Sequence, residues 1–563
     1  MMNRYFNRKT ILILSFLSLF IIGTIFMFIT PFSIKSSYYL TTQTSDGETI
    51  SFNVFEPVQS EDPKKAVLIG HGFMANKEFM KGYAIELAAA GFVAVPFDFR
   101  GHGMSTGSLD RGNLILDVQA IINYLNTTRS DIDMDNLAYI GYSMGGGPGN
   151  QIVNESLNFK AFIGVGTGLG NIRSGDSSNP LNVLMIYAKF DEAFQLSSLV
   201  DSVATRVGVS TAAIDTNQLY GSFDNGNATQ IYLDDNSNHL AVAWDTDFTR
   251  EARDWIINTF PETNTPDENF YGNLRLLLLI IQIIGGIGLF IMLIDPISTL
   301  LKHKQENSEE RLKIEIRDTS AGKLSITSLL YSIPLSIVGI FIIIWIFIPL
   351  PLAIEGFFLS LLFGQVFGIL VLLWRLAKKN DLSLKQILKT PFTRQINDLG
   401  KSIIYGFVLI TILYLILYSS IGLNYIGMVP SITKAWAVAI FIIITFLMFI
   451  IFGIFFQFII RPMIPWTKKG TLKAILIHFG ILLSYMTFFL LFLGFLTGSF
   501  FFFGTTMPVA ICLNLMIAGV SVYTYEKTGN IIAGTLIAAI LFVMIVSTLA
   551  PYQGFLGFLS GFL

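Results

Sequence analysis

Long apolar runs and polar stretches divide the chain into three parts. Residues 11–30 form an apolar run long enough to cross a bilayer. From about residue 36 the composition becomes that of a water-soluble domain, with short alternating and periodic patches. Beyond residue 270 apolar runs recur to the C-terminus. We therefore predict an N-terminal transmembrane anchor at 1–35, a polar domain at 36–269 and a polytopic membrane domain of about eight helices at 270–563.

The apolar runs of the predicted membrane domain are separated by short polar links. They lie near 274–294, 326–349, 352–376, 403–423, 436–459, 472–495, 507–522 and 531–550. With the N-terminal run they predict about nine spans. A cleaved signal peptide is the alternative for the first run, but its apolar region would be shorter, and no clear small-residue cleavage site follows. We favour an uncleaved anchor.

Lys and Arg residues are concentrated in alternate links. Arg4, Arg8 and Lys9 precede the first run, whereas the links 424–434 and 498–506 contain almost no basic residues. Cytoplasmic loops carry an excess of Lys and Arg, so we expect a cytoplasmic N-terminus and an extracytoplasmic polar domain. The basic links carry Lys302, Lys304, Arg311, Lys313, Arg317 and Lys323; Arg375, Lys378, Lys379, Lys385, Lys389, Arg394 and Lys401; and Arg461, Lys468, Lys469 and Lys473.

Within the polar domain, sequence patterns typical of strands alternate with patterns typical of helices. A hairpin is predicted first, because alternating stretches at 38–42 and 49–55 flank the turn dipeptide Asp46-Gly47. This order favours a mostly parallel sheet flanked by helices, with the active site at the carboxyl ends of the strands. Further strands are expected at 66–70, 93–97, 137–141, 161–165, 183–188 and 231–233, and helices at 79–90 and 114–125.

Two motifs stand at the ends of predicted strands. The pentapeptide 141–145 (GYSMG) follows an apolar strand and is typical of a nucleophile elbow, with Ser143 as the nucleophile. With 48 glycines in the chain the pentapeptide alone is a weak signal, so its position after a strand matters. His71-Gly72-Phe73 ends an earlier strand, where the N–H of Phe73 would join the N–H of Met144 in an oxyanion hole. We expect a structural role for the His71 side chain.

The acid and the base are predicted from chain order. Asp191 leaves the end of a strand and is suited to orient an imidazole, although a helix N-cap before 192–199 is the alternative. Of the five histidines, only His239 lies directly after the last predicted strand of the polar domain. The order Ser143, Asp191, His239 is the one expected for this fold.

Residues from about 67 to 254 resemble the α/β-hydrolase superfamily, and most closely its monoglyceride lipase-like and serine aminopeptidase-like branch. The resemblance rests on the stretch 70–72 (GHG), the stretch 97–105 (FDFRGHGMS), the elbow, Asp191 and His239. It implies acyl transfer to water, with Ser143 attacking a carbonyl, His239 carrying the proton and Asp191 holding the imidazole. It also implies that Asp98 and Arg100 brace a loop.

The helical cap that lipases of this family carry has little room here. Only residues 166–182 separate two strands at the position where a cap is usually inserted, so we expect a minimal cap. The stretch 204–220 is a candidate cover for part of the site. We also hypothesise that the bilayer surface or the membrane domain closes the pocket, which favours lipid-like or amphipathic substrates.

Composition narrows the function further. A net charge of -2 gives no case for a nucleic-acid partner. Scattered histidines and a single cysteine, Cys512, offer no metal-site spacing, and we expect no cofactor. We predict a membrane-bound serine hydrolase that cleaves a carboxylic ester, with the bilayer and a small ester or lipid-like molecule as its partners. A serine peptidase or amidase of the same fold is one alternative, and a transporter or scaffold whose outer domain is a sensor or binding module is another.

Overall fold

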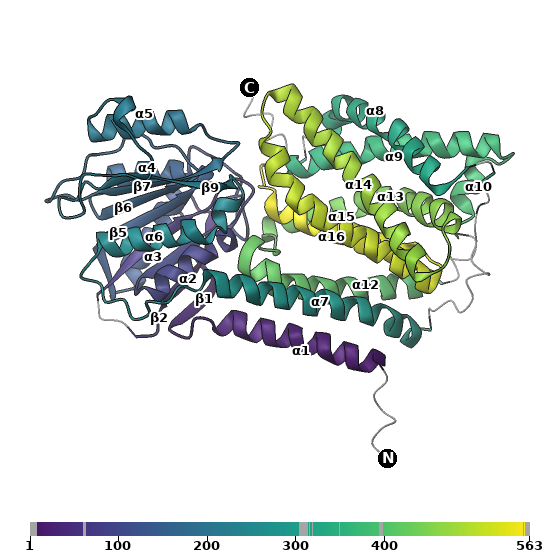
Figure 1. Cartoon of the computed structure of the whole chain (residues 1–563), viewed down its shortest axis with the longest axis horizontal. Coiled ribbons are helices and arrows are strands. Elements are labelled where there is room, and N and C mark those ends of the chain that lie inside the picture. The colour runs from purple at the N-terminus through teal and green to yellow at the C-terminus, as the bar shows by residue number, and fades with distance from the viewer. Residues whose placement is uncertain are drawn as a thin grey trace, which may run out of the picture.

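The structure, a computed structural model, describes residues 8–59, 63–302, 314, 316–317, 319–347, 350–392, 398–554 and 557. A sheet domain lies at one end of the molecule and a bundle of long helices at the other (Figure 1). The two chain segments that join them, α1 (Arg8–Ile29) and α7 (Gly272–Leu300), enter the bundle side by side. Several residues named above lie outside the described residues: Arg4, Lys304, Arg311, Lys313 and Arg394.

One sheet of nine strands organises the described part of the polar domain. Its order is β1-β2-β4-β3-β5-β6-β7-β9-β8, and the six neighbours from β4 to β9 run parallel. The predicted hairpin is present, because β1 pairs antiparallel with β2 across the Asp46-Gly47 turn. The strands are β1 (Ile34–Gln43), β2 (Thr49–Pro57), β3 (Lys64–Gly70), β4 (Val93–Phe97), β5 (Ile132–Tyr142), β6 (Phe159–Val165), β7 (Asn182–Phe190), β8 (Leu219–Tyr220) and β9 (Thr229–Asn238).

Helices cover both faces of this sheet. On β3, Val67 and Ile69 join the cluster under α2 (Lys81–Ala89) and α6 (Thr246–Thr259), whereas Ala66 and Leu68 face the opposite cluster. Strand side chains alternate between faces, so a strand buried on both sides is apolar throughout. The opposite cluster lies under α3 (Leu114–Thr128), α4 (Gly146–Glu155) and α5 (Leu196–Val207). The predicted fold, an α/β-hydrolase domain with a mostly parallel sheet, is confirmed.

Nine helices within the described residues are long and apolar enough to cross a membrane. They coincide with the nine predicted apolar runs, which is consistent with a multi-pass membrane protein. Some boundaries differ by several residues, because α7 ends at Leu300 and not near 294, and α15 runs from Phe501 to Thr528 and not from 507 to 522. Besides α1 and α7 they are α8 (Ala321–Phe347), α9 (Ala353–Lys379), α12 (Leu399–Leu417) with its π-helical extension Tyr418–Ile426, α13 (Ile432–Gly453), α14 (Lys468–Thr497), α15 (Phe501–Thr528) and α16 (Ile532–Leu549).

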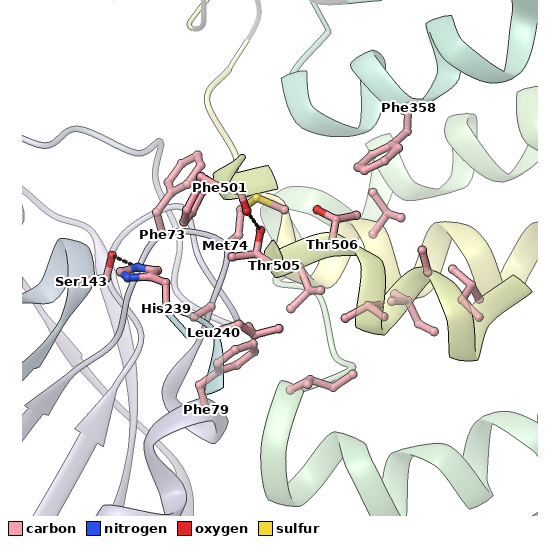
Figure 2. A pocket seen from close by; sticks show the side chains of 18 of the residues that line it. Phe73, Met74, Phe79, Ser143, His239, Leu240, Phe358, Phe501, Thr505 and Thr506 are labelled. Atoms are coloured by element: carbon pink, nitrogen blue, oxygen red, sulfur yellow. Dashed lines mark hydrogen bonds between the residues drawn. The ribbon is translucent and has the colours of Figure 1, made fainter. Parts of the chain in front are cut away.

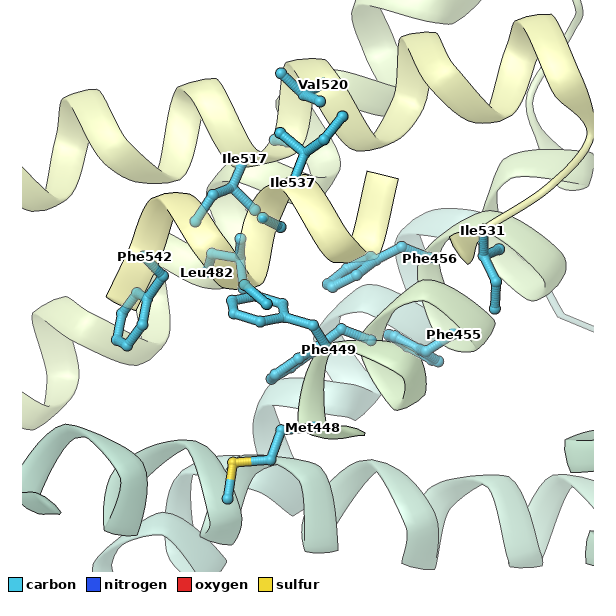
Figure 3. Packing of buried hydrophobic residues seen from close by; sticks show 14 of the residues in the cluster. Met448, Phe449, Phe455, Phe456, Leu482, Ile517, Val520, Ile531, Ile537 and Phe542 are labelled. Atoms are coloured by element: carbon cyan, nitrogen blue, oxygen red, sulfur yellow. The ribbon is translucent and has the colours of Figure 1, made fainter. Parts of the chain in front are cut away.

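Aromatic and branched side chains fill the interior of the bundle. Figure 3 shows Phe449 and Phe456 packed with Leu482, Ile517 and Phe542, which come from α13 to α16 and from the segment after α13. The first helix is part of this bundle and not a separate tether. A Cβ at Gly285 of α7 would lie 2.4 Å from the backbone nitrogen of Phe20 in α1, so only glycine permits this close approach.

The sheet domain is held against one end of the bundle. The link between α12 and α13 contacts it: Asn76 Nδ2 donates to the Ile426 carbonyl at 2.6 Å, and the Ser431 N–H donates to the Gly103 carbonyl at 3.0 Å. At the opposite end of α7, Asp295 pairs with Lys9 at 2.5 Å and with Lys527 at 3.6 Å. Basic side chains therefore gather at the end of these helices remote from the sheet.

Candidate active site

The turn around Ser143 has the geometry of a nucleophile elbow. Strand β5 ends at Tyr142, Ser143 follows with φ +49°, and α4 begins three residues later. A Cβ at Gly145 would lie 2.6 Å from the Gly70 carbonyl oxygen, and one at Gly141 would lie 2.6 Å from the Gly145 oxygen. Close backbone packing therefore explains both glycines, and it accompanies a left-handed backbone conformation at Ser143.

The structure brings Ser143, His239 and Asp191 together. His239 Nε2 lies 3.0 Å from Ser143 Oγ (Figure 2). On the other side of the ring, His239 Nδ1 lies 2.8 Å from Asp191 Oδ2. The acid and the base follow β7 and β9, two neighbouring strands whose carboxyl ends lie at the same edge of the sheet. Since a carboxylate only accepts hydrogen bonds, His239 Nδ1–H donates to Asp191, and Nε2 is left to accept the Ser143 proton.

Asp191 does not cap the predicted helix at 192–199. The helix in this region is α5, which begins at Leu196 after Gln195 at its N-cap. Asp191 Oδ1 instead accepts hydrogen bonds from the backbone N–H groups of Ala193 at 2.8 Å and Phe194 at 3.0 Å. These two donors hold the carboxylate so that Oδ2 faces the imidazole.

Further residues, which no local sequence pattern indicated, position His239. Tyr142 Oη donates to the His239 carbonyl at 2.9 Å, and the His239 N–H donates to Glu192 Oε2 at 3.2 Å. Phe501, at the start of α15, places its ring centre 5.4 Å from that of the imidazole. A Cβ at Gly166 would lie 3.3 Å from both Asp191 Oδ2 and His239 Nδ1. The imidazole is thus enclosed by contacts from both halves of the chain.

His71 has the predicted structural role. Its Nε2 accepts a hydrogen bond from the Phe99 N–H at 3.0 Å, so Nδ1 carries the proton and donates to the Gly72 carbonyl at 2.7 Å. Complete burial lowers the pKa of His71 to about 4, because the charged imidazolium is poorly solvated there. The ring therefore stays neutral and ties two loops at the edge of the sheet together.

The stretch 97–105 is braced by buried carboxylates. Asp98 accepts from Lys77 Nζ at 2.6 Å and from the Met104 N–H at 2.9 Å. Arg100 Nε donates to Asp117 at 2.8 Å, and its terminal nitrogens bind Asp46. These bonds accord with the loop-bracing role that the resemblance implied for Asp98 and Arg100.

The two expected oxyanion donors lie on either side of Ser143. Met144 follows it directly, and Phe73 lines the same cavity as Ser143 and His239 (Figure 2). A Cβ at Gly72 would lie 3.0 Å from the Cβ of Ser143, so the loop that carries Phe73 is in contact with the nucleophile. The N–H groups of Phe73 and Met144 remain the predicted donors.

A cavity of about 120 Å³ opens from Ser143 and His239 toward the helical bundle. Its lining comes from the sheet domain and from α9, α14, α15 and α16. The predicted cover at 204–220 contributes no lining residue within the described part of the chain. The start of α15, which lines the cavity, was predicted to be part of the link 498–506. Its aromatic residues and the sequence Gly504-Thr505-Thr506 were the only local features that could have indicated a role at the site. No metal-binding group of three or more His, Cys, Asp or Glu side chains is found among the described residues.

Comparison with known proteins identifies part of the chain. Residues 61–211 match the family model described as serine aminopeptidase, S33, and Ser143 and Asp191 lie within this match. Two solved structures similar to the chain are crystal forms of an esterase from Pyrococcus furiosus. One is 14% identical and covers 40% of this chain and 94% of its own, and the other is 15% identical and covers 42% and 93%; the TM-score is 0.32 for both. No curated protein matches the chain.

The family match covers the strands and turns that carry the elbow and the acid. Together with the observed sheet it shows the superfamily that the sequence suggested. The chain therefore carries an α/β-hydrolase domain, accompanied by nine long apolar helices among its described residues.

Proposed function

We propose that this protein is a membrane-bound serine hydrolase that cleaves a carboxylic ester, with Ser143, His239 and Asp191 as its catalytic triad. Ser143 Oγ attacks the ester carbonyl while His239 Nε2 takes the hydroxyl proton. The N–H groups of Phe73 and Met144 stabilise the oxyanion. His239 then gives the proton to the departing alcohol, which leaves an acyl group on Ser143. Water, deprotonated by His239, releases the acid and restores the serine.

One observation carries this proposal: the hydrogen-bonded series Asp191, His239, Ser143 ends in an otherwise apolar cavity. The distances of 2.8 and 3.0 Å are those of a nucleophile and base ready to exchange a proton. The described residues that line the cavity include Phe73, Phe79 and Trp244, and none is acidic or basic apart from His239 itself. Such a lining favours a lipid-like ester over a charged substrate.

A peptidase or amidase is the second candidate, because the matched family model is described as a serine aminopeptidase. An aminopeptidase has to bind a positively charged amino terminus, for which a carboxylate is the usual partner. Glu192 lies beside the proposed base, but its carboxylate accepts from the His239 N–H and from Asn238. The ester therefore remains the better supported substrate.

The proposed topology places the N-terminus in the cytoplasm and the hydrolase domain at 36–269 outside, between the anchor at 1–35 and the membrane domain at 270–563. It rests on the segregation of basic residues, with Lys9 and Lys527 at the bundle end remote from the sheet. A transporter has less support. The polar cavity around Gln457 and His478 measures about 10 Å³, which is room for about one water molecule.

A fluorophosphonate probe tests the nucleophile and its orientation together. Intact cells that express the protein are labelled from outside, alongside the Ser143→Ala variant. We expect labelling of the wild type only, since a phosphonate bonds to an activated serine. A correctly folded protein that is not labelled even after detergent solubilisation would refute the proposed activity. Labelling that appears only after the membrane is opened would instead overturn the topology.

A further inference from the structure

One face of α15 forms a wall that leads away from His239. Phe501, Thr505, Val509 and Leu513 line the cavity at intervals of four residues, so they lie on one side of the helix. The twelve residue steps from Phe501 to Leu513 correspond to about 18 Å of helix. Thr505 Oγ1 donates to the Phe501 carbonyl at 2.8 Å, so its hydroxyl is already bonded within the helix. The wall is therefore largely apolar along its length.

The opposite walls have the same character. Phe542, Ile545, Val546 and Leu549 of α16 line the cavity at helical spacing. In Figure 2, Phe358 of α9 lies on the bundle side of the cavity, farther from Ser143 than Thr505 and Thr506. The ring of Phe358 meets that of Phe542 edge to face, with 6.4 Å between the ring centres. These two rings form part of the wall of an apolar site that extends from Ser143 into the helical bundle.

We infer that this site, bounded by α9, α15 and α16, binds the aliphatic acyl chain of the substrate, with the ester carbonyl at Ser143 and the end of the chain at Phe358. The inference rests on the proposed esterase function and adds a substrate class, esters of aliphatic carboxylic acids whose preferred chain length this site sets. It also assigns a function to the helical bundle, because helices of the bundle, and not a cap of the hydrolase domain, form the acyl-binding site.

Such a site selects substrates by the length of their acyl chain. Each methylene group transferred from water to an apolar site improves binding by about fourfold. The gain continues until the chain meets Phe358 and Phe542, where a longer chain no longer fits. A change in the size of Phe358 should therefore move the preferred length.

The experiment uses the full-length protein in detergent and a series of p-nitrophenyl esters from butyrate to palmitate. The readout is kcat/KM as a function of acyl length. Phe358→Trp shortens the site, and we expect it to lower the ratio of palmitate to butyrate hydrolysis at least tenfold. Phe358→Ala lengthens the site and should move the optimum to longer chains.

Phe357→Ala is the matched control. Phe357 is the neighbouring residue on α9, but it packs against Phe489 with 5.0 Å between ring centres and does not line the cavity. Its palmitate to butyrate ratio should stay within twofold of the wild type. Equal shifts in the Phe357 and Phe358 variants, or no shift in either Phe358 variant, would overturn the inference.

A second measurement separates the acyl site from catalysis. A palmitate ester with a diazirine at its terminal carbon is photo-cross-linked to the Ser143→Ala variant, and the modified peptides are located by mass spectrometry. We expect cross-links on α9 and α16 near Phe358 and Phe542. If the variant is cross-linked there but the wild-type protein hydrolyses no ester, the site is supported and the proposed function is refuted. Cross-links confined to other helices would refute the site.

Discussion

Replacing Asp191 with asparagine tests the catalytic geometry most directly. The Asp191 oxygens have different partners: Oδ1 accepts two backbone N–H groups, and Oδ2 accepts the His239 Nδ1–H. An asparagine side chain has one oxygen and one NH2 group. Its oxygen has to stay at the Oδ1 position, because an NH2 group there would face two donors. The NH2 group therefore faces His239.

This orientation of the amide changes the tautomer of the His239 imidazole. When an NH2 group donates to Nδ1, the proton of His239 has to be on Nε2. Nε2 faces Ser143, and once protonated it cannot accept the hydroxyl proton. We expect Asp191→Asn to lower kcat about 10⁴-fold, as loss of the correct tautomer does in serine proteases, with little change in KM. The assay is hydrolysis of p-nitrophenyl butyrate by the purified protein, with the melting temperature measured in parallel.

Glu192→Gln is the matched control for this experiment. Its carboxylate also contacts His239, but at the backbone N–H at 3.2 Å and not at the ring. A glutamine oxygen preserves that bond, so we expect less than a tenfold loss of kcat. An Asp191→Asn variant that keeps more than about a tenth of wild-type kcat would show that the backbone donors do not control the tautomer, and the argument would fail.

Three further predictions concern the fold around the site. Gly145→Ala places a Cβ 2.6 Å from a β3 carbonyl oxygen, so we expect no soluble folded protein; normal yield with normal probe labelling would contradict this. Lys77→Met leaves the Asp98 carboxylate buried without its cation, which costs about 3 kcal/mol and lowers the melting temperature by about 5–10 °C; a change below about 1 °C would refute it. Burial raises the pKa of Glu86 from 4.5 to about 7, so the folded state holds the proton more tightly and loses stability as pH rises through this interval. We therefore expect Glu86→Gln to gain stability relative to wild type between pH 5 and pH 8, by up to about 3 kcal/mol. The difference in melting temperature between the two proteins should grow over this range, and a constant difference would contradict the prediction.

Local patterns predicted the catalytic elements because each depends on neighbours in the sequence. The elbow needs small residues beside Ser143, and Asp191 and His239 directly follow strands that are apolar enough to recognise. The apolar spans were equally clear, since the hydrocarbon core of a bilayer demands long apolar helices. The boundary of α15 was missed because Gly504, Thr505 and Thr506 interrupt the apolar pattern near its start, although the helix already begins at Phe501, whose ring contacts His239.

The sequence by itself determined the order of the nine long apolar helices, the α/β class of the polar domain, and the candidates for nucleophile, acid and base. The tertiary structure alone decided that Ser143 faces the helical bundle and that α9, α15 and α16 line the space in front of it. It also decided that Tyr142 and Glu192 hold His239 in place. The physical reason is distance along the chain: strand and span patterns repeat within a few residues, whereas the pocket joins side chains hundreds of residues apart, and no local periodicity records such contacts.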